Sequence, residues 1–85
     1  MNDNLWLSYI LFSCPHKLTS KDKLVATYLT YFPIEEGMYS GDNVAYVISR
    51  QSGLAVRTIQ KSIGRLVGIG AVSFVTDSHF ILEKI

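Results

Sequence analysis

The sequence predicts an α+β fold that is mostly helical, with a core of three helices followed by a C-terminal β-hairpin. Apolar residues recur at helical spacing in three consecutive stretches, which are residues 20–32, 44–52 and 55–67. Residues 71–83 are instead rich in β-branched and aromatic residues on either side of a tight Asp77-Ser78 turn, which is typical of a hairpin. A chain of 85 residues has room for one hydrophobic core, so we expect a single domain.

The composition indicates a folded protein outside the membrane. Hydrophobic residues make up 48% of the chain and charged residues 18%, unlike the composition of disordered chains. The longest apolar run, residues 5–12, is shorter than the ~20 residues that a membrane span needs, and residues 1–4 lack the positive charge of a secretory signal. The single cysteine, Cys14, cannot form an internal disulfide, which agrees with a reducing compartment. We therefore expect a soluble, cytoplasmic protein that does not enter a membrane.

The first predicted helix, residues 20–32, has recognisable signals at both of its ends. Thr19 and Asp22 have the spacing of a capping box, with Asp in place of the usual Glu, so the helix is expected to begin near residue 20. Pro33 disfavours helical geometry in the residue before it, so the helix is expected to end near Phe32. An apolar segment, residues 1–17, precedes this helix.

The second helix follows a connector that contains a short extended piece at residues 38–40. Asp42 or Asn43 is predicted to cap this helix, residues 44–52, at its start. Gly53 is the residue type usually found just after the C-terminus of a helix, so the second helix is expected to end there.

The third helix, residues 55–67, carries its basic residues on one side. At 100° per residue, Ile59, Ile63 and Leu66 share one face, and the basic residues Arg57, Lys61 and Arg65 lie nearly opposite, flanked by Thr58 and Gln60. No Asp or Glu occurs between residues 44 and 76, although the net charge of the chain is only +1. The cations on this face are suited to bind phosphate groups, and the polar side chains are suited to form hydrogen bonds with the edges of bases. A solvated face that serves solubility alone is the alternative interpretation.

The order of these elements has a known parallel. The stretch from Ile48 to Leu66, with its Gly53-Leu54 turn, followed by Gly70-Ala71-Val72, resembles the winged helix-turn-helix domains of bacterial, phage and plasmid regulators and replication initiators. The resemblance covers roughly residues 20–82. It implies that residues 55–67 are a recognition helix and residues 71–83 a wing hairpin. It also implies sequence-specific binding of double-stranded DNA, either as a small transcriptional regulator or as the DNA-binding domain of a replication initiator.

Carried over by position, the resemblance implies a DNA-binding role for six residues. Those expected to face the major groove are Arg57, Thr58, Gln60 and Lys61. Arg50 or Arg65 is expected to contact phosphate.

The sequence departs from this family's pattern at three places. Ala55 stands where Ser or Thr usually caps the recognition helix. Gly64 and Gly68 each cost about 1 kcal/mol relative to alanine in a helix, which predicts close packing or an early helix end. The turn Thr76-Asp77-Ser78-His79 has no Arg or Lys, so the wing tip is expected to be a poor phosphate ligand.

The N-terminal apolar segment leaves two interpretations open. Its apolar residues cover nearly every direction of a helix, so one interpretation is a homodimer interface through Leu5, Trp6, Tyr9, Ile10 and Phe12. The other is that the segment lies across the first and third helices and completes the core. A domain that binds a protein and never touches DNA is the alternative function, because the net charge is low.

The residues with potential for chemistry do not form a catalytic pattern. Cys14, His16 and His79 lack metal-ligand spacing, and the adjacent Glu35 and Glu36 are read as solvated loop charges. We therefore expect no enzyme activity, no metal or other cofactor, and no small-molecule ligand.

Overall fold

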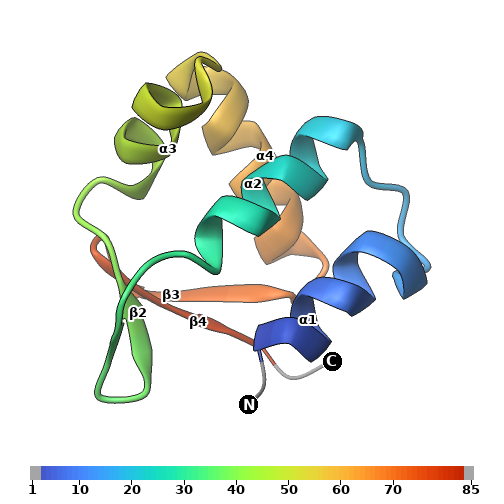
Figure 1. Cartoon of the computed structure of the whole chain (residues 1–85), viewed down its shortest axis with the longest axis horizontal. Helices are drawn as coiled ribbons and strands as arrows, with labels where there is room; N and C mark the ends of the chain where they lie inside the picture. Colours follow the sequence, from blue (N-terminus) through green and yellow to red (C-terminus); the bar gives the residue numbers. More distant parts are fainter. Residues whose placement is uncertain (1–2, 84–85) are drawn as a thin grey trace.

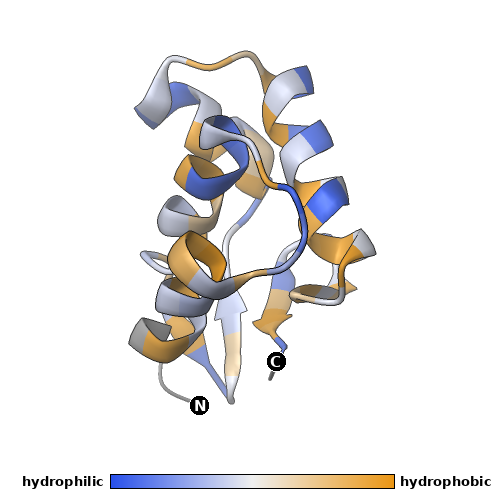
Figure 2. Cartoon of the chain, turned by 90° about the vertical axis from the view of Figure 1, so that its right-hand side faces the viewer, coloured by the Kyte–Doolittle hydropathy of each residue, from blue (hydrophilic) through white to orange (hydrophobic). Residues whose placement is uncertain are grey.

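The computed structural model describes residues 3–83 and has an α+β fold, about half of it helical (Figure 1). The elements in chain order are α1 (Asp3–Ser8), the π-helical turn η1 (Tyr9–Ser13), α2 (Ser20–Leu29), β1 (Ile34–Glu35), β2 (Met38–Ser40), α3 (Val44–Ser52), α4 (Val56–Gly68), β3 (Val72–Thr76) and β4 (His79–Leu82). Each helix carries both hydrophobic and hydrophilic residues (Figure 2), as a helix with one buried face requires. Within residues 3–83, no helix is long and apolar enough to cross a membrane.

The predicted helices are present, with one wrong boundary. Helix α3 has the predicted limits, and α4 is displaced by one residue from the predicted 55–67. Helix α2 ends at Leu29 and not at Phe32. Its last turn tightens because the Thr30 hydroxyl and the Thr30 N–H both donate to the carbonyl of Thr27, at 2.7 Å and 3.2 Å. The N–H of Tyr31 likewise donates to the carbonyl of Tyr28 at 3.0 Å, so the α-helical pattern gives way to these tighter bonds before Pro33 is reached.

The helix starts differ in how they are capped. The predicted capping box of α2 is confirmed, since the N–H of Asp22 donates to Thr19 Oγ1 and the N–H of Thr19 donates to Asp22 Oδ2. Asn43 is the N-cap residue of α3, but it has a φ of 53° and its side chain makes no capping bond, so the predicted side-chain cap is wrong. Ala55 at the N-cap of α4 makes none either. Gly53 ends α3 with a φ of 79°, as expected.

The sheet is larger than the predicted hairpin. It has four antiparallel strands in the order β1-β2-β4-β3. Phe80 of the central strand β4 pairs with Tyr39 on β2 and with Phe74 on β3. The rings of Tyr39 and Phe80 are stacked, with 5.4 Å between their centroids. The extended piece at residues 38–40 is therefore a sheet strand that pairs with the hairpin. The two-residue strand β1 was not predicted.

The N-terminal segment completes the core, so two residues of the predicted dimer interface are assigned wrongly. Trp6 is 3% exposed, Ile10 is fully buried, and Trp6 Nε1 donates to the carbonyl of Ala71 at 2.9 Å. Leu5 and Phe12 remain 69% and 84% exposed. The segment thus has one face against the core and another toward solvent, because only one side of α1 and η1 meets the rest of the domain.

Candidate nucleic-acid interface

Helix α4 presents opposite chemistry on its two faces. Ile59, Ser62 and Leu66 are fully buried on the core side. On the other side Arg57, Gln60 and Lys61 are exposed, and none of them forms an ion pair within the described part of the chain. Helix α4 contains no Asp or Glu, so the charged side chains that it carries on this face are all positive.

The turn between α3 and α4 fixes where α4 begins. The N–H of Gly53 donates to the carbonyl of Ser49, the Ser49 hydroxyl donates to the carbonyl of Leu54, and the N–H of Leu54 donates to Ser52 Oγ. Arg50, in the last turn of α3, is exposed. The short turn therefore holds the end of α3 next to the first turn of α4. Arg50, which was predicted to contact phosphate, lies at this end of α3.

Arg65 is tied to α2, which the sequence pattern did not indicate. Its Nη1 lies 2.7 Å from Oδ1 of Asp22, whose side chain is fully buried, while the Arg65 side chain is 49% exposed. The remaining guanidinium nitrogens are available for a further contact, because Arg carries five N–H donors. Asp22 could have been suspected from the sequence, since a capping carboxylate on a buried helix face needs a cation nearby.

The environment of Asp22 keeps it charged. Burial alone would raise the pKa of Asp22, but the Thr19 backbone N–H, the nearby Ser62 hydroxyl and the Arg65 guanidinium stabilise the carboxylate and hold its pKa below the usual value. The pair of Asp22 and Arg65 thus persists near neutral pH and links α2 to α4.

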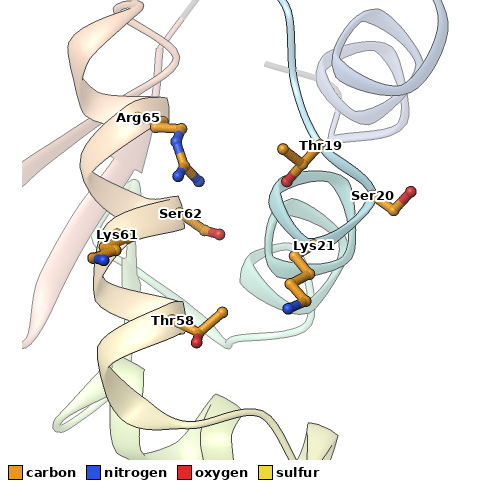
Figure 3. Close-up of a pocket in the computed structure, with 7 residues that line it drawn as sticks. All are labelled: Thr19, Ser20, Lys21, Thr58, Lys61, Ser62 and Arg65. Atoms are coloured by element: carbon orange, nitrogen blue, oxygen red, sulfur yellow. The ribbon is translucent and has the colours of Figure 1, made fainter.

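A pocket of about 470 Å³ lies between the start of α2 and α4 (Figure 3). Its lining residues are Thr19, Ser20, Lys21, Thr58, Lys61, Ser62 and Arg65. Thr58, predicted to face the major groove, is half-buried and extends toward α2 in this view. The contribution of Thr19, Ser20 and Lys21 was missed by the sequence analysis because these residues lie about 40 positions before α4.

The opposite flank of α4 has a different lining. A cavity of about 340 Å³ there is bounded by Asn43, Val44, Ala45, Gln60, Ile63, Phe74 and Asp77. It contains one carboxylate and no cation. The two flanks of α4 therefore differ in charge, basic toward α2 and acidic toward the hairpin.

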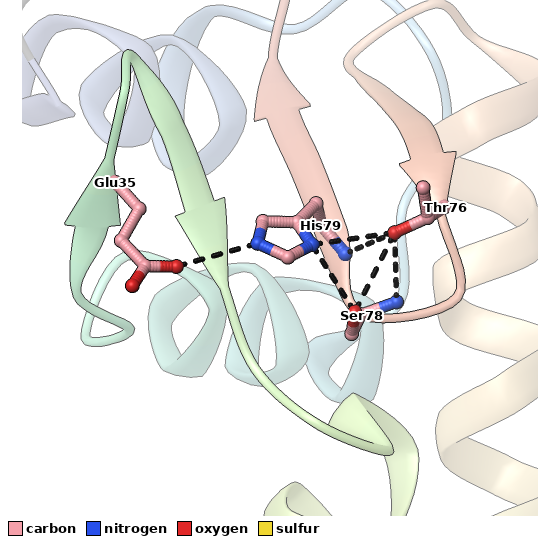
Figure 4. Close-up of polar contacts among 4 residues, drawn as sticks. All are labelled: Glu35, Thr76, Ser78 and His79. Atoms are coloured by element: carbon pink, nitrogen blue, oxygen red, sulfur yellow. Dashed lines mark hydrogen bonds and ion pairs between the residues drawn. The ribbon is translucent and has the colours of Figure 1, made fainter.

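The tip of the β3–β4 hairpin is held by its own polar side chains (Figure 4). Thr76 Oγ1 accepts from the N–H groups of Ser78 and His79, at 3.3 Å and 3.1 Å, and His79 Nε2 lies 3.3 Å from Oε2 of Glu35 on β1. These contacts connect the hairpin to the strand at the far edge of the sheet and bring no Arg or Lys to the tip.

The charges of the whole domain follow the same division. Exposed cations occur at the start of α2, at the end of α3 and on α4, whereas Glu35, Glu36, Asp42 and Asp77 are exposed in the turns around the sheet and before α3. No known protein family, curated protein or solved structure matches the chain. Within residues 3–83, no group of three His, Cys, Asp or Glu side chains is arranged to hold a metal ion.

Proposed function

We propose that this protein binds double-stranded DNA sequence-specifically through α4, as a small transcriptional regulator of the winged helix-turn-helix type. The observation that carries the proposal is the exposed face of α4, where Arg57, Gln60 and Lys61 project from a helix without carboxylates whose opposite face is buried. A helix in the major groove needs this combination of cations and hydrogen-bonding side chains.

The element order supports the same proposal. Helix α3, the Gly53 turn and α4 have the sequence of a helix-turn-helix, and the β3–β4 hairpin follows in the position of a wing. Helix α4 has 13 residues and is therefore about 20 Å long, enough to reach several base pairs in a groove about 12 Å wide.

Each predicted residue has a distinct task in this proposal. Arg57 and Lys61 contact guanine or phosphate, and Gln60 suits the N6 and N7 atoms of adenine. Arg50 contacts the backbone near the first turn of α4. Because Asp77 lies on the hairpin side of α4, the hairpin contributes little to phosphate binding and the backbone contacts concentrate on the α2 side.

The test is binding to random-sequence duplex DNA, measured by fluorescence anisotropy over a salt series. The Arg57→Ala/Lys61→Ala variant is expected to bind at least ten-fold more weakly, with a salt slope shallower by about 2, since two phosphate-neutralising charges are lost. The charge-matched control is Lys17→Ala/Lys23→Ala, which removes two cations outside α4 and is expected to change binding much less.

Selection from a random library then tests sequence specificity. We expect an enriched site whose preference is relaxed at one position in Gln60→Ala, because that substitution removes a base contact and leaves the cations in place. Equal binding by the wild type, the α4 variant and the control would contradict the role of α4.

A second candidate function is protein binding without DNA, and one observation favours it. Tyr46, Phe74 and Val75 are 51%, 38% and 57% exposed, which leaves apolar surface on α3 and the hairpin. Under this alternative, Arg57→Ala/Lys61→Ala leaves partner binding intact and the wild type shows no DNA binding at low salt.

We also propose that the protein is a homodimer that reads two half-sites, because one small module contributes limited affinity. The remaining candidates for the interface are Leu5, Tyr9 and Phe12. Leu5 and Phe12 are exposed on α1 and η1, and Tyr9 is partly buried between them in the chain.

A further inference from the structure

The cavity of about 340 Å³ between α4 and the β3–β4 hairpin, the hairpin cavity, combines apolar and acidic side chains. Among its lining residues Val44 is buried and Ile63 partly buried, whereas Phe74 remains 38% exposed. Of the described residues that line it, Asp77 alone is charged, and the exposed Asp42 lies just before the lining residues at the start of α3. A partner that fits this cavity therefore presents an apolar side chain with a positive charge beside it.

The N-terminal segment of the chain presents this combination on its exposed face. Phe12 is 84% exposed on η1, and Leu5 is 69% exposed on α1. Lys17 is exposed five residues after Phe12, and the sequence has no Asp or Glu between residues 4 and 21. This face is thus complementary to the hairpin cavity in charge as well as in apolar character.

The two complementary surfaces lie at opposite ends of the molecule. In Figure 1 the β3–β4 turn and the segment that leads into α3 are at the left, and α1 with the turn after it is at the right. This direction is the longest axis, along which the molecule extends 30 Å. Phe12 therefore does not reach the cavity of its own chain, and a contact between the two surfaces joins two molecules head to tail.

We propose that the exposed face of the N-terminal segment docks into the hairpin cavity of a second copy of this chain, with Phe12 as the apolar anchor and Lys17 opposite Asp77. The inference rests on the proposed homodimer and identifies the surface that receives Phe12; it does not rest on DNA binding. Arg57 and Lys61 do not line the cavity, so the contact leaves both side chains exposed.

The head-to-tail contact also has a consequence for the DNA site. Two molecules joined in this way point in the same direction, unlike the two halves of a two-fold symmetric dimer. The two half-sites are therefore expected to be direct repeats and not inverted repeats.

The test mixes two variants that each keep one of the two surfaces. Phe12→Ser removes the anchor and keeps the cavity, whereas Ala45→Gln puts a longer side chain into the cavity and keeps the N-terminal segment. In sedimentation velocity without DNA, each variant alone is expected to be monomeric. Their 1:1 mixture is expected to form a dimer that does not grow further, because it retains one intact pair of surfaces. The wild type is expected to form dimers and longer species as its concentration rises.

A charge exchange tests the contact without altering buried residues. Asp77→Lys is expected to weaken association of the wild type by about five-fold to ten-fold, because it places a positive charge opposite Lys17. Addition of Lys17→Asp to the same chain is expected to restore association, since the pair is then reversed. Glu36→Lys is the matched control, because Glu36 is also an exposed turn carboxylate but does not line the cavity, and it is expected to leave association unchanged.

The outcomes separate this contact from the other proposals. Dimerisation of Ala45→Gln alone, with Phe12→Ser monomeric, overturns the cavity as the receiving surface and supports a symmetric contact between two N-terminal segments. A mixture that stays monomeric, or a wild type that stays monomeric at high concentration, overturns the contact and leaves the cavity to a different protein. A wild type that assembles as described but does not bind DNA supports the contact and removes the DNA-binding function.

Discussion

At the scale of single residues, Asp22 connects local structure to tertiary structure. Its two carboxylate oxygens have separate partners, since Oδ2 accepts from the N–H of Thr19 in the capping box and Oδ1 accepts from Arg65. The same side chain therefore begins α2 and joins it to α4. A carboxylate that is fully buried must keep both partners, because an unpaired buried charge is costly.

We predict that Asp22→Asn lowers the free energy of unfolding by about 2 kcal/mol at pH 7, through loss of the charged cap and of the pair with Arg65. Because the pKa of Asp22 is held below its usual 3.8, its contribution is complete above pH 3.8 and disappears as the pH falls through the lower, folded-state pKa. Urea denaturation followed by circular dichroism at pH 7 and at lower pH measures this.

The control for this prediction is Asp77→Asn in the exposed hairpin turn, which is expected to change stability by less than about 0.5 kcal/mol. A difference between the wild type and Asp22→Asn that stays the same from pH 7 down to acid pH would contradict the assigned role of the carboxylate.

At the scale of elements, α4 contains a glycine, Gly64, that lowers the stability of the helix. Both expectations for Gly64 are wrong, because α4 continues past it to residue 68 and a Cβ at this position would pack against no other element within the described residues 3–83. Glycine in a helix interior costs conformational entropy and is not compensated by packing at this position. Gly68 has the same open surroundings, but it is the last residue of α4. The helix end therefore accounts for glycine at this position, which was one of the two explanations that the sequence suggested.

We predict that Gly64→Ala stabilises the protein by about 0.5–1 kcal/mol, since alanine has the higher helix propensity and no clash is introduced. The measurement is the midpoint of urea denaturation. Gly53→Ala serves as the opposite case, because its φ of 79° disfavours a Cβ, and it is expected to destabilise by about 1 kcal/mol or more. Destabilisation by Gly64→Ala would show that α4 meets something at this position.

At the scale of the whole molecule, the N-terminal segment has one buried face and one exposed face. Trp6 and Ile10 close the core over the junction of α4 and β3, where the indole N–H reaches the carbonyl of Ala71. Leu5 and Phe12, on the other face, leave a large apolar area in solvent. The first face determines stability, and the second is the candidate dimer interface.

We predict that Trp6→Phe lowers the free energy of unfolding by about 1–3 kcal/mol, because it removes a buried hydrogen bond and leaves a small cavity. Circular dichroism is the suitable probe, since Trp6 is the only tryptophan. Leu5→Ser/Phe12→Ser is expected to leave the monomer stable and to abolish dimerisation in sedimentation experiments. A wild type that sediments as a monomer at high concentration would rule out this interface.

What could be predicted from sequence is what depends on neighbours along the chain. The capping box of Thr19 and Asp22, the limits of α3, the two-sided pattern of α4 and the hairpin strands all follow from spacing within one or two turns. The exposed Arg57, Gln60 and Lys61 belong to this group, since their position on the helix wheel is a local property.

Only the tertiary structure decided which distant residues share an environment. The partner of Arg65 is 43 residues away, that of Trp6 is 65 residues away, and the pairing of β2 with β4 spans a similar separation. Periodicity shows which side of a helix is apolar, but it does not show what packs against that side. The sequence by itself therefore determined the three core helices, the β3–β4 hairpin and the basic face of α4. Three-dimensional packing decided the four-stranded sheet, the ion pair, the role of Trp6 and the pocket beside α2.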